Sequence, residues 1–225
     1  MSGLRESNYE FVQAGGQVTP NEIDRYERIN TGILSISNTW VGTAASGTAT
    51  QAKALVLINT LLDHPRNLLY GIAGTGDAGG SWTVNGYDQF GQPINETVAL
   101  ATAAAGTSGV AGTLIFAKVT SGTCTLTSDT AGGALGRVGV AVGTSTTAAF
   151  KLGLLTKIAS TADVKAITWV KENVVTTLGG GTIGDCVDAT NHAFTGTSIM
   201  AGTESYNVLL KSTYDNSGKA NLTLL

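Results

Sequence analysis

Charged residues are scarce in this chain of 225 residues. Only 13% of the positions are Asp, Glu, Lys or Arg, roughly half of the share that is usual for a globular domain. The formal net charge is −3, and no cluster of lysines and arginines is present to neutralise the phosphates of a nucleic acid. We therefore expect no nucleic-acid partner, and a surface of small hydroxyl side chains that other proteins cover in part.

Cysteine and histidine are also rare. Cys124 and Cys186 lie far apart in the sequence, with no Cys-x-x-Cys pair, which argues against a zinc site. We expect two ordinary thiols, while a disulfide stays open. His64 and His192 are the two histidines, and no Gly-x-Ser-x-Gly sequence marks a nucleophile. The sequence therefore predicts a protein that is not an enzyme and that has no cofactor and no bound metal.

Long apolar runs are missing as well. The longest, 54–62, is interrupted by two polar residues and is far too short to span a bilayer. The first residues of the chain are polar and do not resemble a secretory signal. We therefore expect no membrane partner and synthesis in a cytoplasm.

Short segments of alternating polar and apolar residues are abundant. In the clearest of them, Trp82 and Val84 alternate with polar residues, the pattern breaks at Asp88–Gln92, and Ile94 and Val98 then fall on one parity with Glu96. A period of two on both sides of a short break predicts a β-hairpin. Turn signals recur about every eight to twelve residues, a spacing typical of antiparallel sandwiches and barrels.

Further strands are expected along the rest of the chain, at 33–37, 54–62, 67–73, 113–120, 123–127, 152–158, 164–171, 186–188, 193–195 and 205–211. The segment 164–171 also fits one face of a helix, but its β-branched residues favour a strand. We predict a mainly all-β protein with an N-terminal arm over residues 1–30. An antiparallel β-sandwich or jelly-roll-like domain follows over 31–138, and a second, smaller β-rich unit over 139–225.

The N-terminal arm differs in composition from the rest of the chain. It holds eight of the 29 charged residues, which are 13 basic and 16 acidic ones, together with several aromatic side chains. Asn21–Arg28 has the signals of a short helix, with Pro20 in its first turn. Aromatic side chains are poorly suited to full exposure, so we predict that the arm lies against another subunit; disorder is the alternative. The contact residues expected from the arm are Tyr9, Phe11, Tyr26, Arg25 and Arg28.

Two motifs that could carry chemistry have a simpler interpretation. Gly74–Gly79 matches Gly-x-Gly-x-x-Gly, but dinucleotide binding needs a helix after the third glycine, and the residues that follow alternate like a strand. We interpret the segment as a hairpin turn. The acidic pairs Asp185/Asp188 and Asp77/Asp88 lack the spacing of a calcium loop, so we expect these carboxylates to bond to the backbone of turns.

The hairpin resembles a segment found in structural proteins of tailed bacteriophages. In that segment a strand ending in Gly-x-Asp, here Gly86–Asp88, is followed by a Gly-containing turn and a strand with Glu-Thr, here Glu96-Thr97. Other parts of the chain are also similar to that family, and together they cover most of residues 65–210: Pro65–Leu68, Val138–Gly143, Leu152–Leu155 and Val187–Thr195. His192 departs from the family pattern, since glycine is usual there. We expect His192 to lie in a turn and to have a left-handed backbone conformation.

The resemblance implies a virion protein, most like a capsid decoration (cement) protein on the outer surface of an icosahedral phage head. Such proteins are commonly homotrimers that bridge several subunits of the major capsid protein and stabilise the shell. Binding at several points multiplies weak contacts, which is compatible with a charge-poor surface and an aromatic arm. Two alternatives stay open: another virion component, such as a tail-tube, head-fibre or adaptor subunit, or a carbohydrate-binding β-sandwich module.

Overall fold

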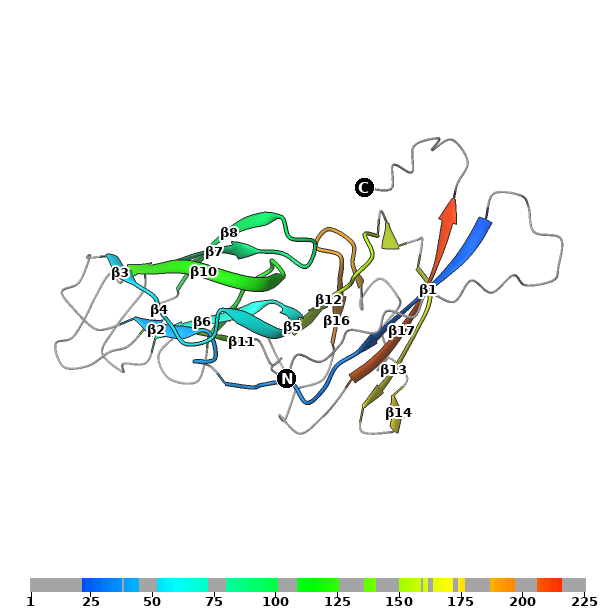
Figure 1. Cartoon of the computed structure of the whole chain (residues 1–225), viewed down its shortest axis with the longest axis horizontal. Coiled ribbons are helices and arrows are strands. Elements are labelled where there is room, and N and C mark those ends of the chain that lie inside the picture. Colours follow the sequence, from blue (N-terminus) through cyan, green and yellow to red (C-terminus); the bar gives the residue numbers. More distant parts are fainter. Residues whose placement is uncertain are drawn as a thin grey trace.

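The computed structural model describes residues 22–37, 39–44, 52–72, 80–100, 109–125, 136–140, 150–158, 160–161, 164–171, 174–176, 187–196 and 206–215. These residues form 17 strands, and there is no α-helix among them. All the strand pairs in these ranges are antiparallel. The predicted all-β, antiparallel, sandwich-like fold is therefore confirmed (Figure 1).

The strands form three sheets (Figure 1). The eight-stranded sheet is curled and has the order β15 (Val187–Asp188), β16 (Ala193–Thr195), β12 (Lys151–Gly153), β5 (Leu61–Arg66), β10 (Phe116–Thr125), β7 (Ser81–Tyr87) and β8 (Pro93–Ala99), with β3 (Ala52–Ala54) also paired to β10. The five-stranded sheet has the order β4 (Val56–Leu57), β2 (Gly42–Ala44), β11 (Gly136–Val140), β6 (Leu68–Ile72) and β9 (Val110–Ala111). The four-stranded sheet has the order β1 (Glu22–Asn30), β17 (Tyr206–Asp215), β13 (Val164–Lys171) and β14 (Val174–Thr176).

The main core lies between the eight-stranded and the five-stranded sheet. Both sheets contribute buried side chains to it, and the largest is Trp82 of β7, which is fully buried. The Trp82 Nε1–H donates a hydrogen bond of 3.1 Å to the carbonyl oxygen of Gly71 in β6. One aromatic side chain therefore fills the core and joins the two sheets. The other members of the cluster are Val41, Ala44, Leu55, Leu62, Leu68, Tyr70, Val84, Leu100, Phe116, Val119, Cys124, Val138 and Val140.

The predicted hairpin is confirmed. β7 and β8 pair in register from Ser81↔Ala99 to Tyr87↔Pro93, and the loop between them is Asp88–Gln92. The Asp88 Oδ1 accepts hydrogen bonds from the backbone N–H groups of Phe90 (2.8 Å) and Gln92 (2.7 Å). This carboxylate therefore bonds to the backbone of its turn, as expected from the sequence.

A glycine is required near the end of β7. A Cβ atom at Gly86 would run into the backbone carbonyl of Lys118 in the neighbouring strand β10. The β7–β10 register also shifts between Val119 and Ser121, where the two strands come together irregularly. The glycine of the hairpin therefore serves close backbone packing.

The expected helix at Asn21–Arg28 is wrong. Residues Glu22–Asn30 form β1, which pairs with β17 of the same chain along its whole length, from Glu22↔Asp215 to Asn30↔Asn207. An isolated helix of eight residues is marginal in water, so a full set of hydrogen bonds to β17 outweighs the local helix signals. Because this part of the arm is a strand of the fold, only residues before it remain candidates for a free arm.

Several other strand predictions also need correction. The segment 54–62 is divided among β3, β4 and β5, and β5 continues through His64 and Pro65 instead of ending there. Proline lacks the N–H that a regular ladder needs, and here β5 pairs with β10 irregularly between Arg66 and Leu61. The expected strands 113–120 and 123–127 are one strand, β10, while of 152–158 only the start is a strand, β12. The predicted strand at 164–171 is confirmed as β13.

The connection between β6 and β7 also differs from the prediction. Residues 73–79, which include the glycine motif, lie outside the described residues, but β6 belongs to the five-stranded and β7 to the eight-stranded sheet. β6 and β7 therefore do not pair with each other as a hairpin. The expected domain boundary at 138/139 falls inside β11, and β12, β15 and β16 share a sheet with β5; whether two units fold separately stays a prediction.

Cys124 of β10 is a free, buried thiol. Burial raises its pKa to about 12, so the reactive thiolate is disfavoured at neutral pH. This agrees with the expectation of an ordinary thiol at this position. Cys186 lies outside the described residues.

Candidate functional site

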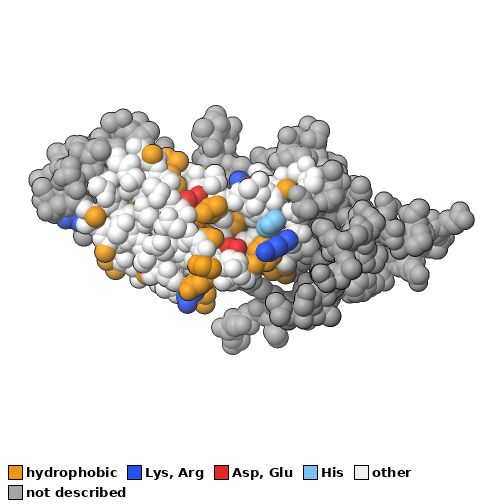
Figure 2. Space-filling view, turned by 90° about the horizontal axis from the view of Figure 1, so that it is seen from above, with side chains coloured by type: hydrophobic (Ala, Val, Ile, Leu, Met, Phe, Trp, Pro, Cys, Tyr) orange, Lys and Arg blue, Asp and Glu red, His pale blue; other side chains and the backbone are white. Residues whose placement is uncertain are grey.

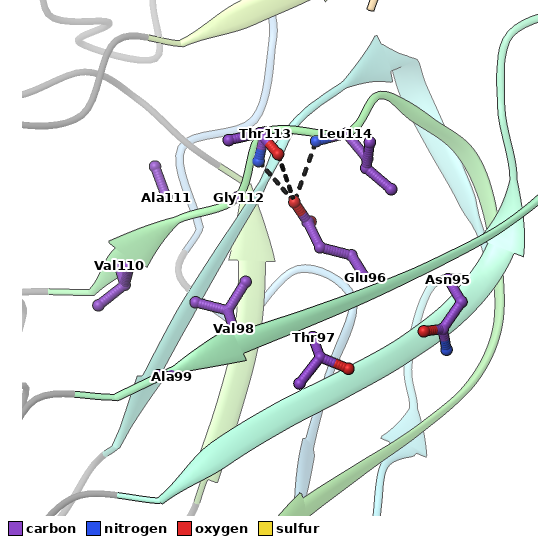
Figure 3. A pocket seen from close by; sticks show the side chains of 10 residues that line it. All are labelled: Asn95, Glu96, Thr97, Val98, Ala99, Val110, Ala111, Gly112, Thr113 and Leu114. Atoms are coloured by element: carbon purple, nitrogen blue, oxygen red, sulfur yellow. Dashed lines mark hydrogen bonds between the residues drawn. The ribbon is translucent and has the colours of Figure 1, made fainter.

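On one side of the sandwich, the described strands of both sheets come to an end. β8 is the last described strand of the eight-stranded sheet, and β9 is the last described strand of the five-stranded sheet. Between them lies a hollow of about 530 Å³, which we call the β8–β9 groove. Its lining residues are Asn95, Glu96, Thr97, Val98, Ala99, Val110, Ala111, Gly112, Thr113 and Leu114 (Figure 3).

The carboxylate of Glu96 lies at the centre of this groove. Glu96 is only 6% exposed, and its Oε1 accepts hydrogen bonds from the Thr113 N–H (2.6 Å), the Leu114 N–H (3.0 Å) and the Thr113 hydroxyl (3.1 Å). Its Oε2 accepts a hydrogen bond of 2.8 Å from the hydroxyl of Tyr70 in β6. Four donors therefore surround one buried carboxylate, which joins β8, β6 and the turn at 113–114. Figure 3 shows the hydrogen bonds from Thr113 and Leu114.

The partners of Glu96 decide what this group can do. The pKa of Tyr70 is raised well above its usual value, first by burial and then by the negative charge of Glu96 and the hydrogen bond to it. Tyr70 therefore stays protonated and keeps donating at neutral pH. With its oxygens occupied by donors from the protein, Glu96 is arranged as a structural clamp and not as an acid or base for a substrate.

The far wall of the groove is also fixed by hydrogen bonds. The N–H of Gly112 donates to the Leu68 carbonyl (2.8 Å), and the Asn67 side-chain amide donates to the Gly112 carbonyl (3.0 Å). A Cβ atom at Gly112 would collide with the Glu96 carboxylate and the Tyr70 ring. The wall therefore approaches the clamp closely, and the groove is formed before any partner binds.

Seen from the β8 side, apolar side chains form patches across the middle of the described surface, with acidic and basic side chains and a histidine among them (Figure 2). The groove adjoins a second cavity of about 220 Å³, since Leu114 lines both. The second cavity lies between the β7–β8 loop and the turn at 189–192. Its lining residues are Asp88, Gln89, Phe90, Ile94, Leu114, Ile115, Lys157, Thr190, Asn191 and His192.

His192 is a structural residue in the wall of this second cavity. It has a φ of 51°, as its place in a turn predicted, and its Nδ1 accepts a hydrogen bond of 3.1 Å from the Ile158 N–H. Its ring meets that of Phe90 edge-on, with centroids 5.6 Å apart. The Gln89 side chain donates to the carbonyls of Asn191 (3.1 Å) and His192 (3.2 Å). These contacts hold the turn against the hairpin loop.

An imidazole, a carboxylate and a hydroxyl thus line one cavity, which is the set a hydrolase needs. However, no hydrogen bond among the described residues joins His192, Asp88 and Thr190 to one another. The Asp88 Oδ1 is held by its own loop, and one nitrogen of His192 is held by Ile158. The relay of base, orienting acid and nucleophile is therefore not assembled in this part of the chain.

Asp188 anchors the same turn from the other side. Its Oδ2 accepts hydrogen bonds from the Lys151 ammonium (2.6 Å) and the Asn191 side chain (2.7 Å), and its Oδ1 accepts one from the Asn191 N–H (3.0 Å). Burial alone raises the pKa of Asp188, but the hydrogen bonds from Asn191 and Lys151 and the lysine charge outweigh it, so the pKa lies below its usual value. The expected turn role of this carboxylate is confirmed; Asp185 and Asp77 lie outside the described residues.

We therefore expect acid to loosen this anchor. Because the pKa of Asp188 is lower in the folded chain, its contribution is present above about pH 4 and is lost as the pH falls through the folded value. Between pH 7 and pH 3, the free energy of unfolding should fall less in Asp188→Asn than in the original chain. The difference should be about 1 kcal/mol or less, since the pair is partly exposed. Urea denaturation at both pH values measures this, and an unchanged acid dependence would contradict it.

None of the residues that the sequence singled out as contacts is among the described residues that line this groove. Tyr9 and Phe11 lie outside the described residues. Arg25 and Tyr26 lie in the part of β1 where only the backbone is described. Arg28 lies further along the same strand, and its side chain is exposed. Glu96 was not among the predicted site residues, although the sequence holds a signal for it. As a charged residue two positions from both Ile94 and Val98, it lies on the apolar face of the strand.

Neither a metal site nor a membrane helix is found in the described ranges. No group of three or more His, Cys, Asp or Glu side chains there could hold a metal ion. In the same ranges, no helix is long and apolar enough to cross a bilayer. Comparison of the chain with models of protein families, with curated proteins and with solved structures gives no match.

Proposed function

We propose that this chain is a non-enzymatic capsid decoration protein, which binds the outer surface of an icosahedral phage head. In this role it bridges several subunits of the major capsid protein, as a homotrimer, and so stabilises the shell. The observation that carries the proposal is the β8–β9 groove. Backbone and small apolar groups line it, and its buried carboxylate is occupied by donors of the protein itself, which suits contact with another polypeptide better than catalysis.

A second surface supports a protein partner. Five of the six large apolar side chains that are exposed among the described residues lie within residues 33–61: Ile33, Ile36, Val56, Ile58 and Leu61. The Ser35 N–H donates a hydrogen bond of 2.7 Å to Asp63 of β5, so the segment with Ile33 and Ile36 lies beside the strand that begins at Leu61. Exposed apolar side chains brought together in this way are typical of surfaces that other proteins cover.

Stabilisation of a shell needs no tight single contact. A protein that binds only the assembled lattice shifts the equilibrium toward that lattice, and a trimer multiplies the effect of each contact. The resemblance of the hairpin and its flanking segments to phage structural proteins adds to this proposal.

The proposal is tested with shells of the corresponding phage that lack the protein. The full chain should bind them and raise the temperature at which they break apart. Deletion of residues 1–21, which removes Tyr9 and Phe11 but keeps β1, should weaken binding at least tenfold, because aromatic anchors dominate protein contacts. Co-sedimentation and electron microscopy measure both effects.

A shorter deletion, of residues 2–8, is the matched control and should bind like the full chain. Equal binding by the chain without residues 1–21 would show that the arm is not the anchor. Failure of the full chain to bind shells would reject the decoration role itself.

No described strand pairs with the outer edge of β8, and this favours a second candidate, a tail-tube subunit. Tube subunits join their strands edge to edge into rings, and an unpaired edge strand is what such joining needs. Gel filtration and negative-stain images distinguish the two functions. Rings or tubes of the purified protein would support the tube, whereas a discrete trimer would support decoration.

A further inference from the structure

The outer edge of β8 presents a regular row of backbone groups. The Leu100 N–H donates to the Gly80 carbonyl and the Asp88 N–H to the Gln92 carbonyl, both at 2.9 Å. In an antiparallel pair, residues alternate between those bonded to the partner strand and those directed away from it. Since the β7–β8 register is unbroken, the even-numbered residues of β8 bond to β7. Asn95, Thr97 and Ala99 therefore direct their N–H and C=O groups away from β7.

No described strand pairs with this outer edge. Native proteins protect free edges with bulges, with lysines, with proline or with a charge that points inward. Pro93 removes only the first outward N–H of β8 and leaves those of Asn95, Thr97 and Ala99. β8 has no register shift against β7, and no lysine or arginine lies between Pro93 and Ala99. Its inward charge, Glu96, is already buried and bonded to four donors. An added strand would bury no new charge there, so this edge is open to pairing.

We propose that β8 accepts an additional strand from the partner protein, laid along the β8–β9 groove. This inference rests on the decoration function, and it assigns the occupant to an extended, uncharged segment of the major capsid protein. Only an extended polypeptide offers N–H and C=O groups at the two-residue spacing of Asn95, Thr97 and Ala99. The outward row spans about 13 Å, so the added strand needs roughly five residues.

The groove also defines the side chains of the added strand. Glu96 and Val98 point toward the segment 110–114, while Asn95 and Thr97 point to the opposite face of β8 (Figure 3). Alternate side chains of a neighbouring strand follow the same two directions. Those that enter the groove meet Val98, Val110 and Leu114 and should be apolar. Those on the opposite face meet Asn95 and Thr97 and should be polar, as in a run of alternating valine and threonine.

The first experiment uses no capsid. The probe is an acetylated and amidated peptide, Thr-Val-Thr-Val-Thr-Val, added to the isotope-labelled full chain and followed by NMR. The amide signals of Asn95, Thr97 and Ala99 should shift, together with those of Val110 and Leu114. A second peptide with every amide methylated keeps the side chains but cannot donate hydrogen bonds from either edge, and it should cause no shifts. Equal shifts with both peptides, or none at millimolar peptide, would overturn the proposal.

The second experiment compares two variants at one position. Thr97→Pro removes one outward N–H, and Thr97→Val keeps it, while both lose the 3.0 Å contact between the hydroxyls of Thr97 and Thr83. Thr97→Pro should weaken peptide binding and shell binding at least tenfold, whereas Thr97→Val should bind like the original chain. Both should fold, because this N–H does not bond to β7; if Thr97→Pro does not fold, Ala99→Pro and Ala99→Val replace the pair.

The outcomes separate this inference from the function on which it rests. Shell binding that is equal for Thr97→Pro and Thr97→Val would overturn strand addition but leave decoration intact. Peptide binding without any shell binding would support the acceptor edge and reject the capsid protein as its occupant. Concentration-dependent dimers that Thr97→Pro abolishes would make a second copy of the chain the occupant, which also overturns the proposal.

Discussion

Replacing Trp82 by alanine is expected to lower the free energy of unfolding by about 3–5 kcal/mol. The Trp82 side chain is fully buried between the two sheets of the sandwich, so its loss leaves a large cavity. The variant also removes the donor that the Gly71 carbonyl accepts from across the sandwich. Chemical denaturation followed by circular dichroism measures the change without relying on the fluorescence of the removed residue.

Two further variants show where this loss comes from. Trp82→Phe keeps an aromatic ring in the core but gives up the hydrogen bond and part of the volume, so we expect about 1–2 kcal/mol. Thr83→Ala, at the next position, lies on the opposite face of β7 and should change stability by less than about 1 kcal/mol. A Trp82→Ala chain as stable as Thr83→Ala would show that this residue does not hold the sheets together.

The sequence was sufficient where the signal is local. The hairpin of β7 and β8 was predicted with its observed loop, Asp88–Gln92, because alternation, turn residues and loop length all lie within 20 neighbouring residues. The turn role of Asp88 and the left-handed conformation of His192 are also local properties, and both were predicted. The all-β class followed from the repetition of such short signals along the chain.

Long-range pairing was beyond the sequence. β1 forms because it pairs along its whole length with β17, nearly 200 residues away. No local sequence pattern predicts this pairing. β6 and β7 are neighbours in the chain but lie in different sheets, since the connection between them joins two layers. The groove also depends on long-range packing, because it lies between β8 and β9, which belong to two different sheets.

The clamp at Glu96 shows how a local signal can have a long-range cause. The alternation along β8 places the carboxylate of Glu96 on the core side of the strand, where an unpaired charge would be very costly. The compensation comes from Tyr70 in the other sheet and from the turn at 113–114. A sequence can raise the question of how such a charge is satisfied, but only the packed sheets answer it.

Removal of this clamp is expected to have the second large effect. Glu96→Ala leaves the Thr113 and Leu114 N–H groups and the Tyr70 hydroxyl without their acceptor, and buried donors left in this way are costly. We expect a loss of about 2–4 kcal/mol in the free energy of unfolding. Glu96→Gln keeps one carbonyl oxygen for the turn, while its NH₂ group can donate to the Tyr70 hydroxyl oxygen, so it should cost about 1 kcal/mol.

The clamp also predicts the behaviour of the protein in alkali. The pKa of Tyr70 is raised in the folded chain by burial and by Glu96, so its contribution to stability is complete below about pH 10 and is lost as the pH rises toward the folded value. Tyr70→Phe should remove this part of the alkaline loss, and Glu96→Ala should reduce it, because burial remains when the charge is gone. Ultraviolet titration should show one tyrosine that ionises only as the chain unfolds. If every tyrosine of the folded chain ionises near pH 10, the buried pair between the two sheets does not exist in solution.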